Sequence, residues 1–221
     1  MSVFVYHEPK TVGVSAATLI AAQLIQTPSS VLGIDYHENL LPVYDSLSAM
    51  TENGLLNWND AQIYQLFEFL PDESGEQRIA NLLGKALFAK TDISEKQYAV
   101  PFSKTRAPET TADCYESAIL KDGGLDVALL AVRRDGSLLM NRRADCAPFT
   151  HVERDEDDGF ITVGLSALMQ AKHLIVVGTG RECADAVRTM LRANLTESPL
   201  SALKLHPNAT FILDEEAAEM L

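Results

Sequence analysis

Four arginines surround one short turn in the stretch LLAVRRDGSLLMNRR, residues 129–143 of the chain. They lie in pairs on either side of the turn: Arg133, Arg134, Arg142 and Arg143. The apolar runs before and after the turn predict a tight hairpin. A guanidinium can hold a phosphate or carboxylate through two parallel hydrogen bonds, so the cluster could build an anion site. Charge runs also commonly face water, so a solvated rim and a surface for a partner are the other two interpretations.

Two acidic residues are candidates for proton transfer, because general acid–base catalysis needs a titratable group within hydrogen-bond reach of the substrate. Asp135 belongs to the dipeptide Asp135-Gly136, which is typical of a tight turn. Glu68 lies near the end of an apolar run at residues 61–69. Several other reactive side chains have no catalytic partner in the sequence and are expected to be structural: Cys183, His151, His173 and His206.

Composition indicates an ordinary soluble globular protein. The chain has 221 residues, a net charge of −13, 47% hydrophobic residues and a mean hydropathy near zero, which suits a single domain over residues 1–221. The acidic balance argues against general affinity for nucleic acid or anionic membranes, without excluding a small anion site. No run reaches the roughly 18 apolar residues of a membrane helix. The N-terminal residues lack a signal-peptide pattern, so we expect a cytoplasmic protein.

Short apolar runs alternate along the chain with longer segments of helical period. The strand-like runs include residues 2–6, 30–34, 61–69, 125–132 and 173–179. The helical segments include residues 11–26, 40–50, 76–89 and 181–193, and the chain ends in ATFILDEEAAEML, which indicates a strand and a short acidic helix. This alternation predicts a doubly wound, Rossmann-like α/β fold with a mostly parallel sheet and helices on both faces. Ligands of such sheets bind beyond the carboxyl ends of the strands, which singles out the loops after Ile34, Phe69, Val132 and Thr179.

Three longer segments carry a family resemblance. TVGLSALMQAKHLIVVGTG (162–180) has a Thr-Val-Gly-rich start and a hydrophobic strand that ends in glycine, and LSALKLHPNATFILDEEAA (200–218) contains a Leu-x-Leu-His-Pro element. SVLGIDYHENLLPVYDSL (30–47) combines a strand, a loop and a helix. Together they resemble the family of glucosamine-6-phosphate deaminases (glucosamine/galactosamine-6-phosphate isomerases) and 6-phosphogluconolactonases. The resemblance covers most of the chain and implies a role in carbohydrate metabolism, with a phosphorylated sugar as the ligand.

The turn with the four arginines falls in the frame of the family's Gly-x-Gly-x-Asp-Gly-His signature. In the family the glycines let the backbone approach the substrate and the histidine transfers protons. Here the frame reads AVRRDGS, residues 131–137. Asp135 and Gly136 are kept, but both glycines are replaced and Ser137 stands where the histidine would be. A serine without a partner base cannot relay protons near pH 7 as an imidazole can.

The other catalytic positions also differ from the family pattern. The aspartate base of the deaminases, in a Met-Asp-Glu-Tyr motif, falls at Phe67, although the neighbouring Glu68 is retained. The acid that follows the signature histidine falls at Arg142. The phosphate loop, rich in Gly and Thr in the family so that backbone amides can cradle an anion, reads DYHEN at residues 35–39. Its two acids are expected to repel phosphate.

Part of the anion-binding chemistry is expected to survive. THVER (150–154) resembles a Thr-His-x-x-Arg segment whose arginine holds the substrate phosphate, and Arg154 would be that ligand. The lysine of a Gly-x-x-Lys turn is replaced by Cys183, but Arg181 could reach the same space from a helix N-terminus. We therefore predict phosphate binding by Arg154 and Arg181. The rim of the pocket is predicted to include Arg133, Arg134, Gly136 and Ser137.

Two classes of function remain. The first is a divergent, non-catalytic relative, a pseudoenzyme that binds a small sugar phosphate or associates with a partner subunit. The second is an active isomerase, deaminase or lactonase with relocated groups, in which Glu68 and Asp135 are the catalytic carboxylates. The joint loss of base, histidine and phosphate loop favours the first class. We expect no metal, cofactor, nucleic-acid or membrane partner, and the sequence leaves a homo-oligomer open.

Overall fold

The computed structural model describes residues 1–72, 76–141, 147–154, 158–192, 194 and 198–221. Its centre is a seven-stranded sheet in the order β1-β10-β9-β6-β2-β3-β5, and every neighbouring pair is parallel. In that order the strands are Ser2–Tyr6, Ala209–Asp214, His173–Gly178, Val127–Ala131, Val31–Ile34, Gln62–Gln65 and Tyr98–Ala99. The prediction of a mostly parallel α/β fold is confirmed.

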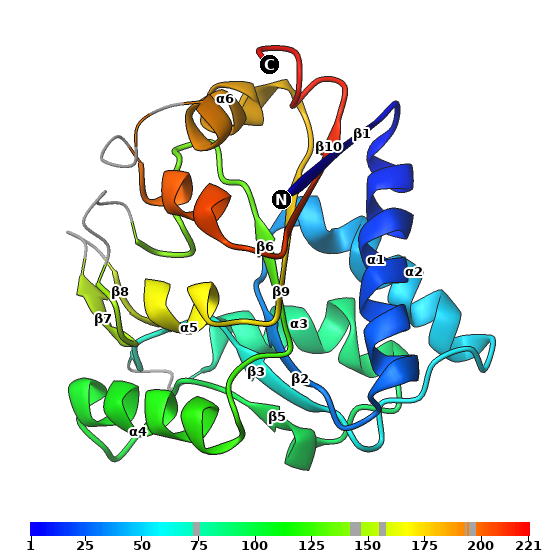
Figure 1. Cartoon of the computed structure of the whole chain (residues 1–221). Helices are drawn as coiled ribbons and strands as arrows, with labels where there is room; N and C mark the ends of the chain where they lie inside the picture. Colours follow the sequence, from blue (N-terminus) through cyan, green and yellow to red (C-terminus); the bar gives the residue numbers. More distant parts are fainter. Residues whose placement is uncertain (73–75, 142–146, 155–157, 193, 195–197) are drawn as a thin grey trace.

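Helices flank this sheet on both sides (Figure 1). On one side α1 and α2 pack against each other, and on the opposite side lie α4, α5 and α6. The helix α3 contacts both α2 and the strand β4. In chain order, the α-helices of the described residues are Pro9–Gln26, Leu41–Glu52, Arg78–Ala86, Pro108–Lys121, Leu165–Met169 and Ala184–Arg192. No helix in the described part of the chain has both the length and the apolar character needed to cross a membrane.

The chain builds the large sheet in two halves that start from its middle. From β2 it adds β3 and β5 towards one edge, and from β6 it adds β9 and β10 towards the other, where β1 completes the sheet. The strands β2 and β6 are neighbours, paired from Leu32–Val127 to Ile34–Leu129. The strand order reverses between them. In sheets of this kind, such a switch point leaves a crevice beyond the carboxyl ends of the strands, where ligands bind.

The apolar run at residues 61–69, predicted as one strand, is two strands in two sheets. The strand β3 ends at Gln65 in the large sheet, whereas β4 belongs to a small antiparallel sheet in the order β4-β8-β7. Leu66 joins them: its amide donates to the oxygen of Ile34 and its oxygen accepts from the amide of Val163, both at 2.9 Å. The strands of the small sheet are Phe67–Phe69, Gly159–Thr162 and His151–Arg154.

Two local predictions are wrong. The apolar run after the arginine turn does not return as a hairpin strand, and only a single bridge links Leu138 with Asn141 among the described residues. Leu138 and Leu139 are fully buried, so this segment packs into the core rather than onto a strand edge. The acidic C-terminal segment forms turns instead of a helix. At its start the Asp214 carboxylate accepts the amide of Ala217 at 2.7 Å.

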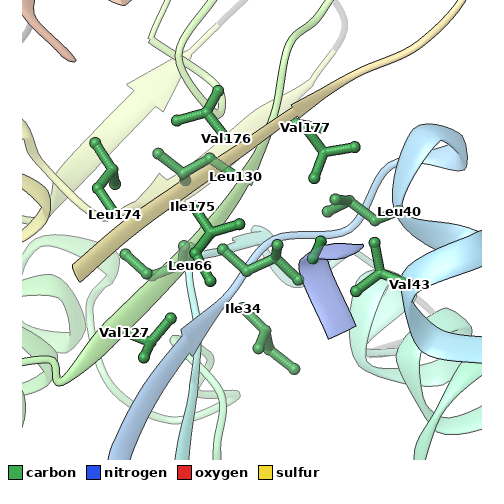
Figure 2. Packing of buried hydrophobic residues seen from close by; sticks show 14 of the residues in the cluster. Ile34, Leu40, Val43, Leu66, Val127, Leu130, Leu174, Ile175, Val176 and Val177 are labelled. Atoms are coloured by element: carbon green, nitrogen blue, oxygen red, sulfur yellow. The ribbon is translucent and has the colours of Figure 1, made fainter. Parts of the chain in front are cut away.

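The core lies along the central strands (Figure 2). The strands β2, β6 and β10 are buried at every residue, which is why they appear in the sequence as continuous apolar runs rather than as alternating patterns. Figure 2 shows side chains of β6 and β9 packed with Ile34 and Leu66 and, from the segment after β2, Leu40 and Val43. This packing fixes the carboxyl ends of β2 and β6 side by side.

Candidate functional site

A buried ion pair lies at the switch point between β2 and β6. Asp35 follows β2 directly, and Arg133 follows β6 by two residues. Nη1 of Arg133 donates to Oδ2 of Asp35 at 2.8 Å and Nη2 donates to Oδ1 at 2.6 Å, the parallel fork that a guanidinium forms with a carboxylate. The amide of Ala131 donates to the same carboxylate at 3.0 Å. One charge pair therefore connects the two halves of the sheet.

Arg133 is buried, so the interpretation of this arginine as part of a solvated rim is wrong. Only 7% of its surface is exposed, and Asp35 is fully buried. The guanidinium also lies 5.5 Å from the centre of the Phe67 ring. A charged group removed from water requires a partner of opposite charge. Arg133 is buried because Asp35 provides that partner, and Asp35 is compensated by Arg133 in the same way. The Asp35 carboxylate, expected to repel phosphate, is neutralised by this pairing.

A histidine at the same place was missed in the sequence reasoning. His37 lies in the loop after β2, and its Nδ1 accepts a hydrogen bond from the amide of Asn39 at 3.3 Å. Burial, and after it the charge of Arg133, lowers the pKa of this imidazole, so the ring is neutral near pH 7 and could accept a proton. Three nearby carboxylates oppose the shift: Asp35, Glu38 and Asp135. The signal available in the sequence was its position in a loop that follows a strand end.

Asn39 and Cys183 hold three loops together. The side-chain amide of Asn39 donates to the backbone oxygens of Val132 at 3.3 Å and Thr179 at 3.5 Å. The Cys183 thiol donates to the oxygen of Val132 at 3.4 Å. Burial raises the pKa of this thiol, which stays protonated and uncharged. The structure therefore places a buried, neutral group at the position that the resemblance gave to a lysine.

The turn in the signature frame satisfies its own polar groups. Gly136 has a φ of 72°, a left-handed conformation that glycine adopts without strain. Oδ1 of Asp135 accepts hydrogen bonds from the amide of Ser137 at 3.0 Å and from its hydroxyl at 2.7 Å. Ser137 is buried, whereas Asp135 and Arg134 are exposed. A cavity of about 150 Å³ is lined by the turn and by α6 and the segment after it: Arg134, Asp135, Gly136, Asp185, Ala186, Thr189, Ser198 and Pro199.

Glu68 caps the helix α3. Its Oε1 accepts the amides of Phe69 at 2.8 Å and Ile79 at 3.0 Å. Its Oε2 accepts the amide of Ala80 at 3.0 Å and the side chain of Gln65 at 3.1 Å. The first amides of a helix have no partner within it, so a buried carboxylate at this end satisfies groups that would otherwise be left unpaired. This structural role accounts for the full burial of Glu68 without a catalytic one.

The two arginines predicted to bind phosphate lie in different parts of the fold, and both are exposed. Arg154 ends β7 and pairs with Glu109 at 3.3 Å. Arg181 follows β9 in a 3-10 turn and pairs with Glu219 at 3.1 Å. The strand β9 ends at Gly178, three residues before Arg181. Each guanidinium is thus held by a different carboxylate.

Some predicted features lie outside the described residues. They include Arg142, Arg143 and the central part of the acidic cluster, residues 155–157. Within the described ranges, no group of three or more His, Cys, Asp or Glu side chains is placed to hold a metal ion. The charged and titratable side chains at the switch point are therefore Asp35, His37 and Arg133, whereas Arg154 and Arg181 are exposed and paired with other carboxylates.

The sequence and the fold match known sugar-phosphate enzymes. A sequence model of the family described as glucosamine-6-phosphate isomerases/6-phosphogluconolactonase matches residues 39–212. A glucosamine-6-phosphate deaminase of Pseudarthrobacter chlorophenolicus is 31% identical over 242 residues, covering 100% of this chain and 93% of that protein. Another, from Mycolicibacterium smegmatis, is 30% identical over 245 residues, with 100% and 93% covered.

Solved structures show the same architecture. A monomeric glucosamine-6-phosphate deaminase has a TM-score of 0.93 at 22% identity, covering 100% of both chains. A 6-phosphogluconolactonase from Trypanosoma brucei has a TM-score of 0.76 at 18% identity, covering 100% of this chain and 98% of that one. Similarity at these identities describes the fold, whereas the family match extends over most of the sequence. The chain belongs to the family of glucosamine-6-phosphate isomerases and 6-phosphogluconolactonases.

Proposed function

We propose that this chain binds a small phosphorylated sugar without catalysing the deamination, isomerisation or lactone hydrolysis of its family. The observation that carries this proposal is the Asp35–Arg133 ion pair at the switch point. Removing one partner of a buried ion pair costs about 3–5 kcal/mol, because the other charge is left uncompensated. The pair is therefore a lasting part of the fold. Neither group is free to transfer a proton or to hold a phosphate.

The side chains in the catalytic frames support the same proposal. The hydroxyl of Ser137 donates a hydrogen bond to the Asp135 carboxylate, and no imidazole lies at that position. Phe67, in the frame of the deaminase base, is a buried ring and has no titratable group. Proton transfer to or from a sugar requires a group of suitable pKa within hydrogen-bond reach, and these two positions supply none.

Arg154 and Arg181 remain the candidates for the phosphate of the ligand. Their ion pairs with Glu109 and Glu219 are exposed, and exposed pairs contribute only about 0–1 kcal/mol. A phosphate near charge −2 could displace either carboxylate at small cost, and the planar guanidinium offers it two parallel hydrogen bonds. Binding through these residues leaves the buried Asp35–Arg133 pair intact.

A second candidate function is an active sugar-phosphate enzyme with relocated proton-transfer groups. The observation that favours it is His37, whose pKa is lowered by burial and by the neighbouring Arg133. A neutral imidazole at the switch point is a suitable general base. In this candidate Asp135, which is near enough to affect the His37 imidazole, would stabilise the protonated ring. Glu68, whose carboxylate accepts four hydrogen bonds at the start of α3, would take no part in the proton transfer.

Two measurements on the purified chain distinguish these candidates. Coupled assays for deaminase, isomerase and lactonase activity test for turnover, and thermal shifts with glucosamine-6-phosphate and 6-phosphogluconate test for binding. We expect the phosphorylated sugars, but not the parent sugars, to raise the melting temperature, since a ligand of the native state stabilises it. We expect no turnover. A rate within about 1–10³ per second that His37→Gln abolishes would instead establish the second candidate.

Substitution of Arg154 tests the phosphate site directly. A charge-assisted hydrogen bond contributes roughly 1.5–3 kcal/mol, so Arg154→Ala should weaken sugar-phosphate binding about tenfold or more. Lys90→Ala, which breaks an exposed pair with Asp45 elsewhere on the surface, is the control and should leave the affinity unchanged. Titration calorimetry with the ligand found by thermal shift measures both. Equal affinity for wild type and Arg154→Ala would remove Arg154 from the site.

A further inference from the structure

Beyond Lys10 in its first turn, the exposed face of α1 carries no charge. Residues 11–26 contain no Asp, Glu, Lys or Arg, although the chain has 31 acidic and 18 basic residues. Four exposed residues at helical spacing form a stripe, called here the α1 stripe: Val14, Thr18, Ala22 and Ile25. A surface helix normally presents charged and polar residues to water. A neutral stripe that includes Val14 at 43% and Ile25 at 65% exposure is therefore typical of a surface that another molecule covers.

Two grooves adjoin the α1 stripe, one towards each end. A groove of about 550 Å³ near the N-terminal half of α1 runs between α1 and α2, and its apolar lining is Val14, Pro42, Ala49, Met50 and Leu55. A second groove of about 530 Å³ lies at the C-terminal end of α1, and its apolar lining is Leu24, Ile25, Pro28, Leu55 and Leu56. Leu55 belongs to both and is 66% exposed. In Figure 1 the two helices form the outer layer of the molecule on this side.

We propose that the α1 stripe is a dimer interface at which a second copy of this chain packs, with the two α1 helices antiparallel around a two-fold axis. Val14 and Ile25 lie on the same stripe, about 16 Å apart along the helix axis. An axis midway between them places Ile25 of each copy over the groove beside Val14 of the other. Such an interface is self-complementary, since every contact occurs twice.

The shape and charge of the surface fit a second copy. Thr18 and Ala22, which lie where the helices would cross, are small, so the two helix axes can approach closely. Lys10 lines the groove at one end of α1 and Asp60 lines the groove at the other. Antiparallel packing therefore sets Lys10 of each copy beside Asp60 of its partner. Each copy has a net charge of −13, so a stripe without acids limits the repulsion between two copies. The acids beside the stripe are Asp45 in one adjoining groove and Asp60 in the other.

The association does not depend on the proposed ligand. It is tested by sedimentation equilibrium of the full chain in moderate salt. The protein concentration should span about 1–500 µM, since interfaces of modest area are commonly weak. We expect a monomer–dimer equilibrium. Ile25→Glu, which places an acid in the partner's groove, should raise the dissociation constant tenfold or more. Leu120→Glu makes the same kind of change at a 55% exposed position on α4, and it should leave the constant unchanged.

A charge exchange tests the orientation of the two helices. Lys10→Glu and Asp60→Lys should each weaken the dimer several-fold. The first variant places two acidic side chains beside each other across the interface, and the second places two lysines there. The two together restore opposite charges in a two-fold dimer and should recover most of the wild-type affinity. A monomer at every concentration, a dimer insensitive to Ile25→Glu, an equal effect of Leu120→Glu, or additive losses in the charge-exchanged double variant would each overturn the inference.

Discussion

At the scale of single residues, two charged side chains that the family resemblance did not lead us to expect explain each other. Arg133 falls in the frame that the resemblance gives to a signature glycine, and Asp35 falls in the frame of the phosphate loop. Taken separately, the first suggests an added anion ligand and the second a loop that repels anions. The structure pairs them across 98 residues of chain in a buried fork. Either charge would be costly to bury alone, whereas together they are compatible with a folded protein.

The first prediction concerns the strength of this pair. Arg133→Ala leaves the Asp35 carboxylate buried without its partner, and we expect the free energy of unfolding to fall by about 3–5 kcal/mol. Urea denaturation measures the change. Arg134→Ala, at the exposed neighbour, should stay within about 0.5 kcal/mol of wild type.

A double variant separates the pair from simple loss of packing. Asp35→Leu combined with Arg133→Leu removes both charges, and replacing a buried pair by apolar groups is often neutral or stabilising. The double variant should therefore be more stable than Arg133→Ala. If Arg133→Ala were as stable as wild type, the pair would not contribute to the fold. The main support for the proposal that Asp35 and Arg133 cannot act on a ligand would then be lost.

At the scale of elements, Glu68 links the small sheet to a helix. It stands on β4 and accepts the amides of Ile79 and Ala80 at the start of α3. That helix has no side-chain cap from the residue that precedes it. The carboxylate of β4 therefore replaces a local cap, which explains why an acid is retained in a strand whose other residues, Phe67 and Phe69, are aromatic.

We predict that Glu68→Ala destabilises the protein by about 1–3 kcal/mol, because it leaves buried amides unsatisfied. Hydrogen exchange should show faster exchange at Ile79 and Ala80 in particular. Glu52→Ala, at the exposed C-terminal residue of α2, is the control and should leave both amides protected. Unchanged exchange in Glu68→Ala would mean that α3 is capped by other groups.

The contact between β9 and β10 carries a pH-dependent contribution. Nε2 of His173 and the hydroxyl of Thr210 lie 2.9 Å apart. Burial, and after it the charge of His206, lowers the pKa of His173. Below about pH 6.5 the unfolded imidazole takes up a proton, whereas the folded one does so only at lower pH. The unfolded state then binds more protons, so the free energy of unfolding falls as the pH drops below that value.

We expect His173→Gln to reduce this dependence between pH 5 and 7, with a change in slope of at most about 1.4 kcal/mol per pH unit. Urea denaturation at several pH values gives the slopes. Thr210→Val keeps the imidazole and removes only its partner, so the slope should persist. Identical slopes for wild type and His173→Gln would show that the imidazole titrates alike in the folded and unfolded states.

At the scale of the whole molecule, the excess of acid sets the response to salt. The net charge of −13 produces self-repulsion in the compact state. Salt screens exposed charges, with a Debye length of about 30 Å at 0.01 M and about 10 Å at 0.1 M. Buried pairs such as Asp35–Arg133 are screened much less.

We therefore predict that sodium chloride raises the melting temperature by a few degrees between about 0.01 and 0.3 M, most steeply at the low end. Differential scanning calorimetry is the measurement. The same titration at pH 5, closer to the isoelectric point of about 4.7, is the control and should show a smaller rise. A melting temperature that falls with salt at pH 7 would mean that exposed ion pairs outweigh the repulsion.

The sequence alone determined the architecture of this protein. Continuous apolar runs such as residues 127–131, alternating with helical segments, require a parallel sheet buried on both faces. Local patterns carry this information because hydrophobic periodicity reflects the element to which a residue belongs. The family resemblance also followed from contiguous segments. The sequence also identified the loops that meet at the switch point, because the hydrophobic pattern shows where each strand ends.

Only the tertiary structure decided what the side chains in those loops do. Whether Arg133 faces water or Asp35, whether Glu68 meets a ligand or the amides of α3, and whether one apolar run divides at Leu66 all depend on residues distant in the sequence. The order of residues along the chain gives no distance between such residues in the fold. Burial then sets the outcome, because a charged group removed from water must find its partner in the fold.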